Sequence, residues 1–124
     1  MIEKLKNYLS GFDGFFGKTI SVDYDEFEKS DVIISPVPVA ETVKKYADGG
    51  EIKQFVFCLR LKQDFGFGNN EAYHIFDELL KYMSDNFIME NALYFEVLES
   101  CHLKKSTAVY AEYEMKFRLI YTEG

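Results

Sequence analysis

The stretch that decides the fold runs from Pro36 to Leu61 and reads PVPVAETVKKYADGGEIKQFVFCLRL. Asp48-Gly49-Gly50 stands at its centre, and two glycines after an aspartate supply the positive φ values that a tight hairpin loop requires. Over Lys53–Leu61, apolar side chains recur at every second residue, which is typical of a β-strand with one buried face. Thr42–Ala47 can pair back onto this strand through either a two-residue or a three-residue loop. The sequence therefore predicts a β-hairpin here.

Two prolines precede the hairpin. Pro36 and Pro38 lack an amide proton and cannot donate a hydrogen bond to a neighbouring strand. We therefore expect both at a sheet edge, a bulge or a bend.

The remaining elements follow from their periodicity. Helical spacing of apolar residues predicts a short helix from Ile2 to Leu9, which Gly11 ends, and a longer helix over Ala72–Phe87. Alternating patterns predict further strands over Lys18–Tyr24, Asp31–Ser35, Tyr94–Lys104 and Ala108–Tyr121, with a turn at Lys105–Thr107 and a connector over Gln63–Asn70. The predicted fold class is α+β, a mostly antiparallel sheet of about five strands with two helices on one face.

Length and composition indicate one ordinary globular domain over residues 1–124. Of these residues 48% are hydrophobic and 28% charged, which excludes general disorder. The net charge of −7 is the opposite of what sequence-independent nucleic-acid binding requires, so we expect no nucleic-acid partner. No apolar run has the length of a signal peptide core or a membrane span. We expect the protein to be made in the cytoplasm and to have no membrane partner.

No group of residues forms a convincing catalytic or metal site. Cys101-His102 pairs a nucleophile with a base, but neighbours on a strand point to opposite faces. Cys58 and Cys101 lack metal-site spacing and are expected to be buried thiols. The acidic run Asp23–Asp31 lacks the spacing and the glycine of a calcium loop, and Gly66–Gly68 is too short for a phosphate loop. We expect no catalytic residue, no metal and no cofactor.

Several of these residues together resemble small minor structural proteins of tailed phages and prophages. The family is often described as minor capsid proteins and is similar to tail terminators. The resemblance rests on Ser35-Pro36-Val37-Pro38, Val43-Lys44-Lys45-Tyr46, Asp48-Gly49-Gly50 and Gln54-Phe55-Val56-Phe57, together with Ile20–Tyr24 and the N-terminal helix. It covers the first half of the chain and, in the second half, the order of elements, although the connector after Asp64 is shorter than in the family. It implies a tail-terminator-like domain without catalytic residues.

The resemblance also implies a function and partners. Members of the family assemble as rings, commonly hexamers, at the head-proximal end of the tail. There they stop tube polymerisation and contact head-completion proteins. The expected role is a virion structural protein, a tail terminator or head–tail joining component, whose partners are itself, the tail tube and head-completion proteins. Two alternatives stay open: a non-catalytic protein-binding adaptor or regulatory module, and a small hydrolase or ligand-binding domain with the Gly66–Gly68 connector as a lid.

The final hairpin supplies the candidate contacts. A strand over Ala108–Tyr121 would span roughly 45 Å at ~3.3 Å per residue, more than a small core requires. We expect part of it to pack against another molecule, as the Asp48-Gly49-Gly50 hairpin and the connector also could. The candidate contact residues are Phe67 of the connector and five residues on the polar face of the return strand: Tyr110, Glu112, Glu114, Lys116 and Arg118.

Overall fold

The structure, a computed structural model, describes residues 1–15, 18–23, 31–64, 71–86 and 90–123. Its elements in chain order are α1 (Ile2–Ser10), the 3-10 turn η1 (Asp13–Phe15), β1 (Ile20–Val22), β2 (Val32–Val37), β3 (Thr42–Lys45), β4 (Glu51–Asp64), α2 (Glu71–Asp85), β5 (Ala92–Ser106) and β6 (Tyr110–Glu123). The α+β class with two helices is confirmed.

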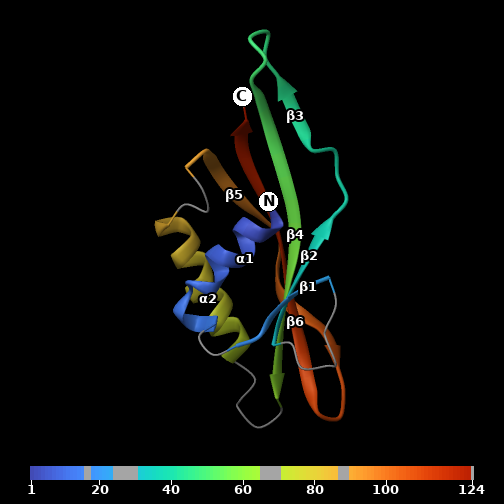
Figure 1. The fold of residues 1–124 in the computed structure, drawn as a ribbon. Helices are drawn as coiled ribbons and strands as arrows, with labels where there is room; N and C mark the ends of the chain where they lie inside the picture. Colours follow the sequence, from blue (N-terminus) through green and yellow to red (C-terminus); the bar gives the residue numbers. More distant parts are fainter. Residues whose placement is uncertain (16–17, 24–30, 65–70, 87–89, 124) are drawn as a thin grey trace.

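The six strands form one sheet around β4. The strand order is β1-β2-β4-β6-β5, and β3 also pairs with β4. One edge of β4 pairs with β6 along its whole length, while the other edge pairs first with β3 and then with β2 (Figure 1). All pairings are antiparallel except that of β1 with β2. The mostly antiparallel sheet predicted from the sequence is thus confirmed, with six strands instead of about five.

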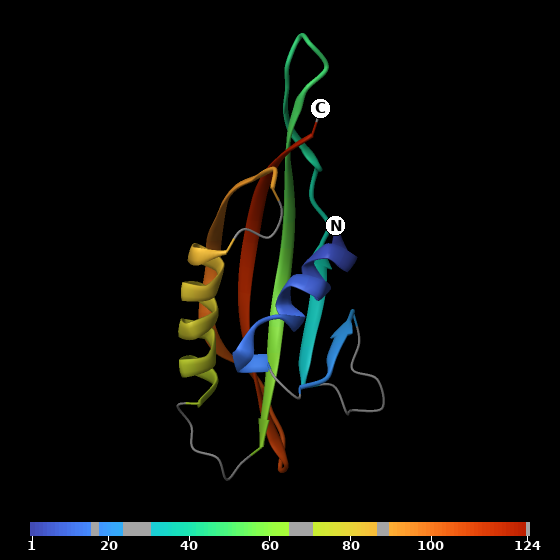
Figure 2. The same ribbon diagram turned by 60° about the vertical axis from the view of Figure 1, so that its left-hand side comes forward.

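Both helices pack on one face of this sheet (Figures 1 and 2). The helical periodicity explains which side chains are buried: Leu5 and Leu9 of α1, and Ala72, Ile75, Phe76, Leu79 and Met83 of α2. The strand periodicity of two supplies the opposing layer, in which Phe57 of β4 and Phe117 of β6 are fully buried. Their rings stack with centroids 5.3 Å apart. The core therefore lies between the helices and the central strands.

The predicted hairpin is present, and it has the three-residue loop. Tyr46 N–H donates to the Gly50 carbonyl at 2.8 Å, which encloses Ala47, Asp48 and Gly49. Asp48 Oδ1 accepts a hydrogen bond from Gly50 N–H at 3.0 Å. Among the described glycines only Gly49 has a positive φ, of +93°. The expectation that both glycines supply positive φ values was therefore wrong for Gly50.

The two prolines occupy the positions that the sequence predicts for them. Pro36 lies in β2 opposite Phe57, beyond Ile34, where β1 stops pairing with β2. The Ile34 carbonyl accepts a hydrogen bond from Asp23 N–H on the edge of β2 that faces away from β4. The backbone groups of residues two apart on a strand point to the same side, so the nitrogen of Pro36 faces this edge as well. The missing amide proton of Pro36 therefore faces an edge without a strand in the described chain. Pro38 follows the last residue of β2, where the chain bends toward β3.

Several boundaries differ from the predicted ones. β4 is longer than the apolar alternation indicates, because its pairing with β6 runs from Asp64 opposite Tyr110 to Glu51 opposite Glu123. β6 has the predicted length but begins and ends two residues later than the predicted Ala108–Tyr121. The turn of the last hairpin lies at Thr107–Val109 instead of Lys105–Thr107, since Thr107 Oγ1 accepts from Val109 N–H and Tyr110 N–H. β1 is shorter than predicted, and β2 extends to Val37. Phe67, the connector residues 65–70 and Phe87 lie outside the described residues.

Candidate assembly surface

The sheet face opposite the helices, here called the outer face, carries the candidate contact residues of β6. The register of β6 with β4 places Tyr110, Glu112, Glu114, Lys116 and Arg118 on this face. Their neighbours there are Cys58, Arg60 and Lys62 of β4, and Glu96, Glu99, His102 and Lys105 of β5. The outer face is therefore a polar layer made by three adjacent strands.

Two of these candidate residues are less accessible than the sequence analysis assumed. Glu112 is 4% exposed and Glu114 is 6% exposed. The reason is the sheet order, because β6 lies between β4 and β5 and long side chains from both neighbours cover it. The Lys104 ammonium lies 3.7 Å from the Glu114 carboxylate. In the free chain these two carboxylates are therefore buried groups and not part of an exposed contact surface.

The two basic candidate residues, Lys116 and Arg118, are paired across the strands with glutamates of β5. Lys116 Nζ lies 3.8 Å from Glu99, and Arg118 Nε lies 4.0 Å from Glu96. Half-exposed pairs of this kind stabilise a fold by only about 0–1 kcal/mol each. Arg118 Nε is buried and has no hydrogen-bond partner within the described chain, because the Glu96 carboxylate is too distant.

The edge of the sheet formed by β5 is the most accessible apolar surface beside this face. One side of β5 pairs with β6, and the described residues contain no strand on its other side. Five large apolar side chains on β5 are between 38% and 52% exposed: Leu93, Tyr94, Val97, Leu98 and Leu103. A long apolar edge strand is a template for pairing with another chain.

Sequence reasoning missed the β5 edge because it concentrated on the alternation in β6. The sequence did contain a signal for this edge, because apolar side chains lie on both faces of the strand. They are Leu93, Tyr94, Phe95, Val97 and Leu98. Only Phe95 of these packs against the core. The pairing of β5 with β6 shifts register at several points, and such bulges restrict how another strand can join the edge. The stretch Tyr94–Val97 has the regular register that another strand could join, and Leu98 and Leu103 extend the exposed apolar surface beyond it.

The β3–β4 hairpin forms a second projecting element. Figure 1 shows that it extends beyond the helices at one end of the molecule. Its exposed apolar side chains are Val43 and Tyr46, each about half exposed. The Lys44 ammonium lies 5.0 Å from the centre of the Tyr46 ring. This hairpin remains a candidate contact, as the sequence indicates.

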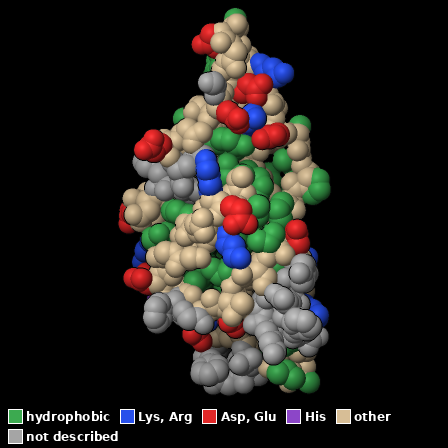
Figure 3. All heavy atoms as spheres, viewed as in Figure 1, with side chains coloured by type: hydrophobic (Ala, Val, Ile, Leu, Met, Phe, Trp, Pro, Cys, Tyr) green, Lys and Arg blue, Asp and Glu red, His purple; other side chains and the backbone are tan. Residues whose placement is uncertain are grey.

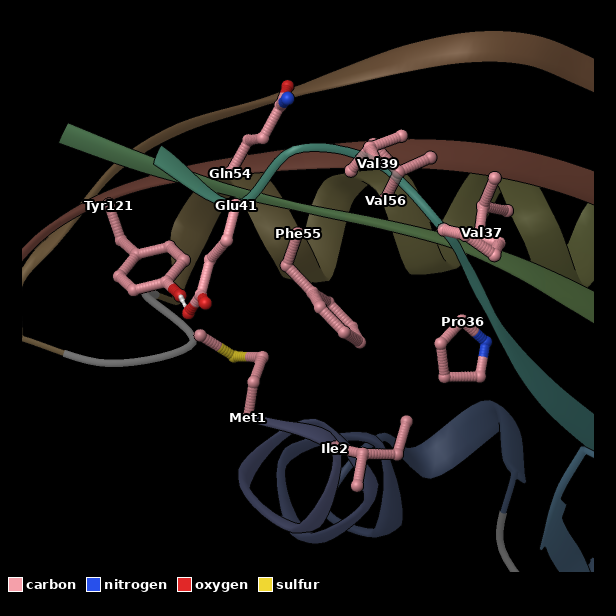
Figure 4. Close-up of a pocket in the computed structure, with 11 residues that line it drawn as sticks. Met1, Ile2, Pro36, Val37, Val39, Glu41, Gln54, Phe55, Val56 and Tyr121 are labelled. Carbon is pink, nitrogen blue, oxygen red and sulfur yellow. Dashed lines mark hydrogen bonds between the residues drawn. The ribbon is translucent and has the colours of Figure 1, made fainter. Parts of the chain in front are cut away.

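An apolar hollow lies between the start of α1 and the segment that joins β2 to β3 (Figures 3 and 4). It has a volume of about 400 Å³, and its apolar lining includes Met1, Pro36 and Phe55. Its polar side chains already have partners in the chain. Glu41 accepts a hydrogen bond from the Tyr121 hydroxyl at 3.3 Å, and Gln54 donates to the Ala40 carbonyl at 2.7 Å. The hollow therefore offers shape and apolar surface without a converging set of unpaired polar groups.

Cys101 and His102 point to opposite faces of β5. Cys101 packs against the core under the helices, while His102 lies opposite Glu114 on the outer face. Burial raises the pKa of the Cys101 thiol from 9.0 to about 11. Burial also raises the pKa of Cys58 on the outer face. Both thiols are only partly buried, whereas the sequence predicts buried thiols, and neither is held in the nucleophilic thiolate form at neutral pH.

The raised pKa of Cys101 gives a testable expectation about its reactivity. In a Cys58→Ser variant below pH 9, Cys101 should react with iodoacetamide roughly a hundredfold more slowly in the folded chain than in denaturant, since two pKa units separate the thiols. The stabilisation from the neutral buried thiol is complete below pH 9 and is lost as the pH rises toward 11. Equal alkylation rates in the folded and unfolded chains would show that burial does not suppress the Cys101 thiolate, and a faster rate in the folded chain would show activation.

No helix among the described residues has the length and apolar character needed to cross a membrane.

Comparison with known proteins assigns no family to the chain. A scan against protein-family models gives no match, and a search of curated proteins gives none. The case for a function therefore rests on the β5 edge, the outer face and the resemblance carried by the β3–β4 hairpin.

Proposed function

We propose that this chain is a non-catalytic structural protein of a phage virion, which joins copies of itself into a ring at the junction of tail and head. In that position it caps the tail tube as a tail terminator or head–tail joining component. Its partners are further copies of the chain, the tail-tube protein and head-completion proteins. The proposed location in the virion, at the junction of tail and head, is based on the resemblance of the first half of the sequence to phage minor structural proteins.

The observation that carries the proposal is the exposed apolar edge of β5. A free chain that exposes Tyr94, Leu98 and Leu103 on an edge strand, with no described strand on its outer side, leaves apolar surface and backbone hydrogen-bonding groups in water. Self-association covers both at once. When this edge of one copy contacts a different surface of the next copy, the contact is head to tail and closes into a ring if the rotation between neighbours permits it.

The charges of the chain agree with this role. The net charge is −7, so a ring with acidic surface toward its lumen would let DNA pass without holding it. On the outer face, Lys116 and Arg118 make only long ion pairs. Their partners at an interface would be carboxylates or backbone carbonyls of the neighbouring subunit.

Self-association can be tested with a paired substitution in β5. Leu98→Lys together with Leu103→Lys places two charges on side chains that are 44% and 52% exposed, so the monomer should stay folded. The dissociation constant of the oligomer should rise at least about tenfold, because apolar contacts in an interface are replaced by desolvated charge. Sedimentation equilibrium over a concentration series measures this constant.

The control is Val109→Lys, which introduces one such charge at a 69% exposed site in the adjoining turn, and each single β5 variant, Leu98→Lys or Leu103→Lys, is the comparison of equal charge. Val109→Lys should leave the dissociation constant unchanged. In a phage that lacks this gene, the control should restore normal tail length and head joining, and the β5 variant should not. Full restoration by the β5 variant would exclude this edge as the contact, and normal particles without the gene would exclude the virion role.

A further inference from the structure

We propose that Glu99, His102 and Glu114 form a binding site for a divalent transition-metal ion of the Zn²⁺ type. One ligand atom from each side chain lies within 4.8 Å of the other two. The site joins β5 to β6 on the outer face and is separate from the apolar edge that the proposed assembly uses.

A bulge in β5 creates this arrangement. Residues three positions apart on a regular strand point to opposite faces, which would separate Glu99 from His102. The register shows that Glu99 pairs with Lys116 and His102 pairs with Glu114, so β5 contains one residue more than β6 between these pairs. The extra residue turns both side chains to the outer face. Bulges often re-aim side chains at functional sites.

The histidine is oriented as metal-binding histidines are. His102 Nδ1 lies 2.8 Å from the Ser100 carbonyl oxygen, which can only accept a hydrogen bond. The proton therefore resides on Nδ1, and Nε2 keeps its lone pair for a ligand. A backbone carbonyl that fixes the ring through its other nitrogen is the usual second partner of a metal-bound histidine.

The donor set favours Zn²⁺ and similar ions over Ca²⁺ or Mg²⁺. It combines one imidazole with two carboxylates, whereas Ca²⁺ and Mg²⁺ prefer oxygen ligands alone. Bond lengths of about 2.0–2.2 Å around Zn²⁺ place tetrahedral ligand atoms roughly 3.3–3.6 Å apart, so small side-chain movements close the site. Glu114 is buried, while the Glu99 side chain is 49% exposed and pairs only with the half-buried Lys116 among the described residues. A fourth position then faces solvent.

Two lysines hold the carboxylates when no ion is bound. Lys104 Nζ lies 3.7 Å from Glu114, and Lys116 Nζ lies 3.8 Å from Glu99. Each ammonium competes with a cation for the same carboxylate. Removing the Lys104 charge should therefore strengthen metal binding, a result that a merely structural ion pair would not give.

Titration of the chelator-treated, untagged full chain with ZnCl₂ tests the site. Isothermal titration calorimetry at neutral pH should show one Zn²⁺ per chain. His102→Ala should weaken binding by about tenfold or more, since it removes the only nitrogen ligand. Lys104→Met should tighten binding several-fold. The control is His74→Ala, which removes the other histidine from an exposed position on α2 and should leave the affinity unchanged.

Circular dichroism of each variant separates lost binding from lost folding. Glu99→Gln provides a second ligand variant at a half-exposed side chain, so it should fold and bind less tightly. Wild-type chain that takes up no more Zn²⁺ than His102→Ala would overturn the proposal. The proposal would also be overturned if His74→Ala lost Zn²⁺ binding. It would likewise be overturned if Cys58→Ser lost Zn²⁺ binding while His102→Ala retained it.

Discussion

Replacing Phe117 by alanine is expected to lower the free energy of unfolding by about 3–5 kcal/mol. Phe117 is fully buried on the helix side of β6, where it stacks on Phe57 and contacts Phe95 at a ring-centroid distance of 6.4 Å. Its removal takes away apolar burial and leaves a cavity that neighbouring strands cannot fill, because their hydrogen bonds fix their positions. A domain of this size has a total stability of about 5–15 kcal/mol, so the variant should be close to unfolding.

Chemical denaturation monitored by circular dichroism gives the free energy directly. Val109→Ala is the control, because it removes apolar atoms from a 69% exposed side chain just before the same strand. Its effect should stay within about 0.5 kcal/mol. A loss below about 1 kcal/mol for Phe117→Ala would mean that the core is not centred on the stacked aromatic rings of β4 and β6.

The burial of Phe117 was predictable because it depends on periodicity alone. Alternation along β6 identifies the buried row, and the helical stripe Ala72, Phe76, Leu79 and Met83 identifies the element that covers it. The Asp48-Gly49-Gly50 turn fixes which strand pairs with the next. These signals are local in sequence, so they give the fold class, the hairpin and the second helix.

The candidate surface was less predictable because it depends on the order of strands. Periodicity does not show that β6 lies between β4 and β5, nor that β5 is the edge. The sequence therefore predicts that Glu112 and Glu114 lie on an exposed polar face, although neighbouring side chains cover them in the structure. The bulge between Glu99 and His102 is a property of the pairing of two strands, so the spacing of these residues did not indicate a shared site.

The second large effect is expected for Glu112→Lys, which should destabilise the chain by roughly 3–5 kcal/mol. Glu112 is 4% exposed and pairs in register with Lys62 on one side and Lys105 on the other. The Glu112 carboxylate favours the charged form of the Lys62 ammonium on the neighbouring strand. A lysine at position 112 would place a buried positive charge between the positions of Lys62 and Lys105, and burial of an unpaired charge is among the most costly changes in a protein. Thermal or chemical denaturation of the variant measures the loss.

Asp77→Lys is the matched control, since it makes the same charge change at an exposed position on α2 and should cost less than about 1 kcal/mol. Glu112→Gln separates charge from shape and should fall between the two. If the Glu112→Lys chain were fully stable, the Glu112 side chain would have to reach solvent. Glu112 would then again be a candidate for direct contact with another subunit. If Glu112→Lys unfolds as expected, its failure to restore a phage that lacks this gene shows only that the folded monomer is lost. It then says nothing about an interface. Substitutions on the exposed edge of β5 then become the only valid test of assembly among these residues, because they change the surface while the buried charges of the outer face stay balanced.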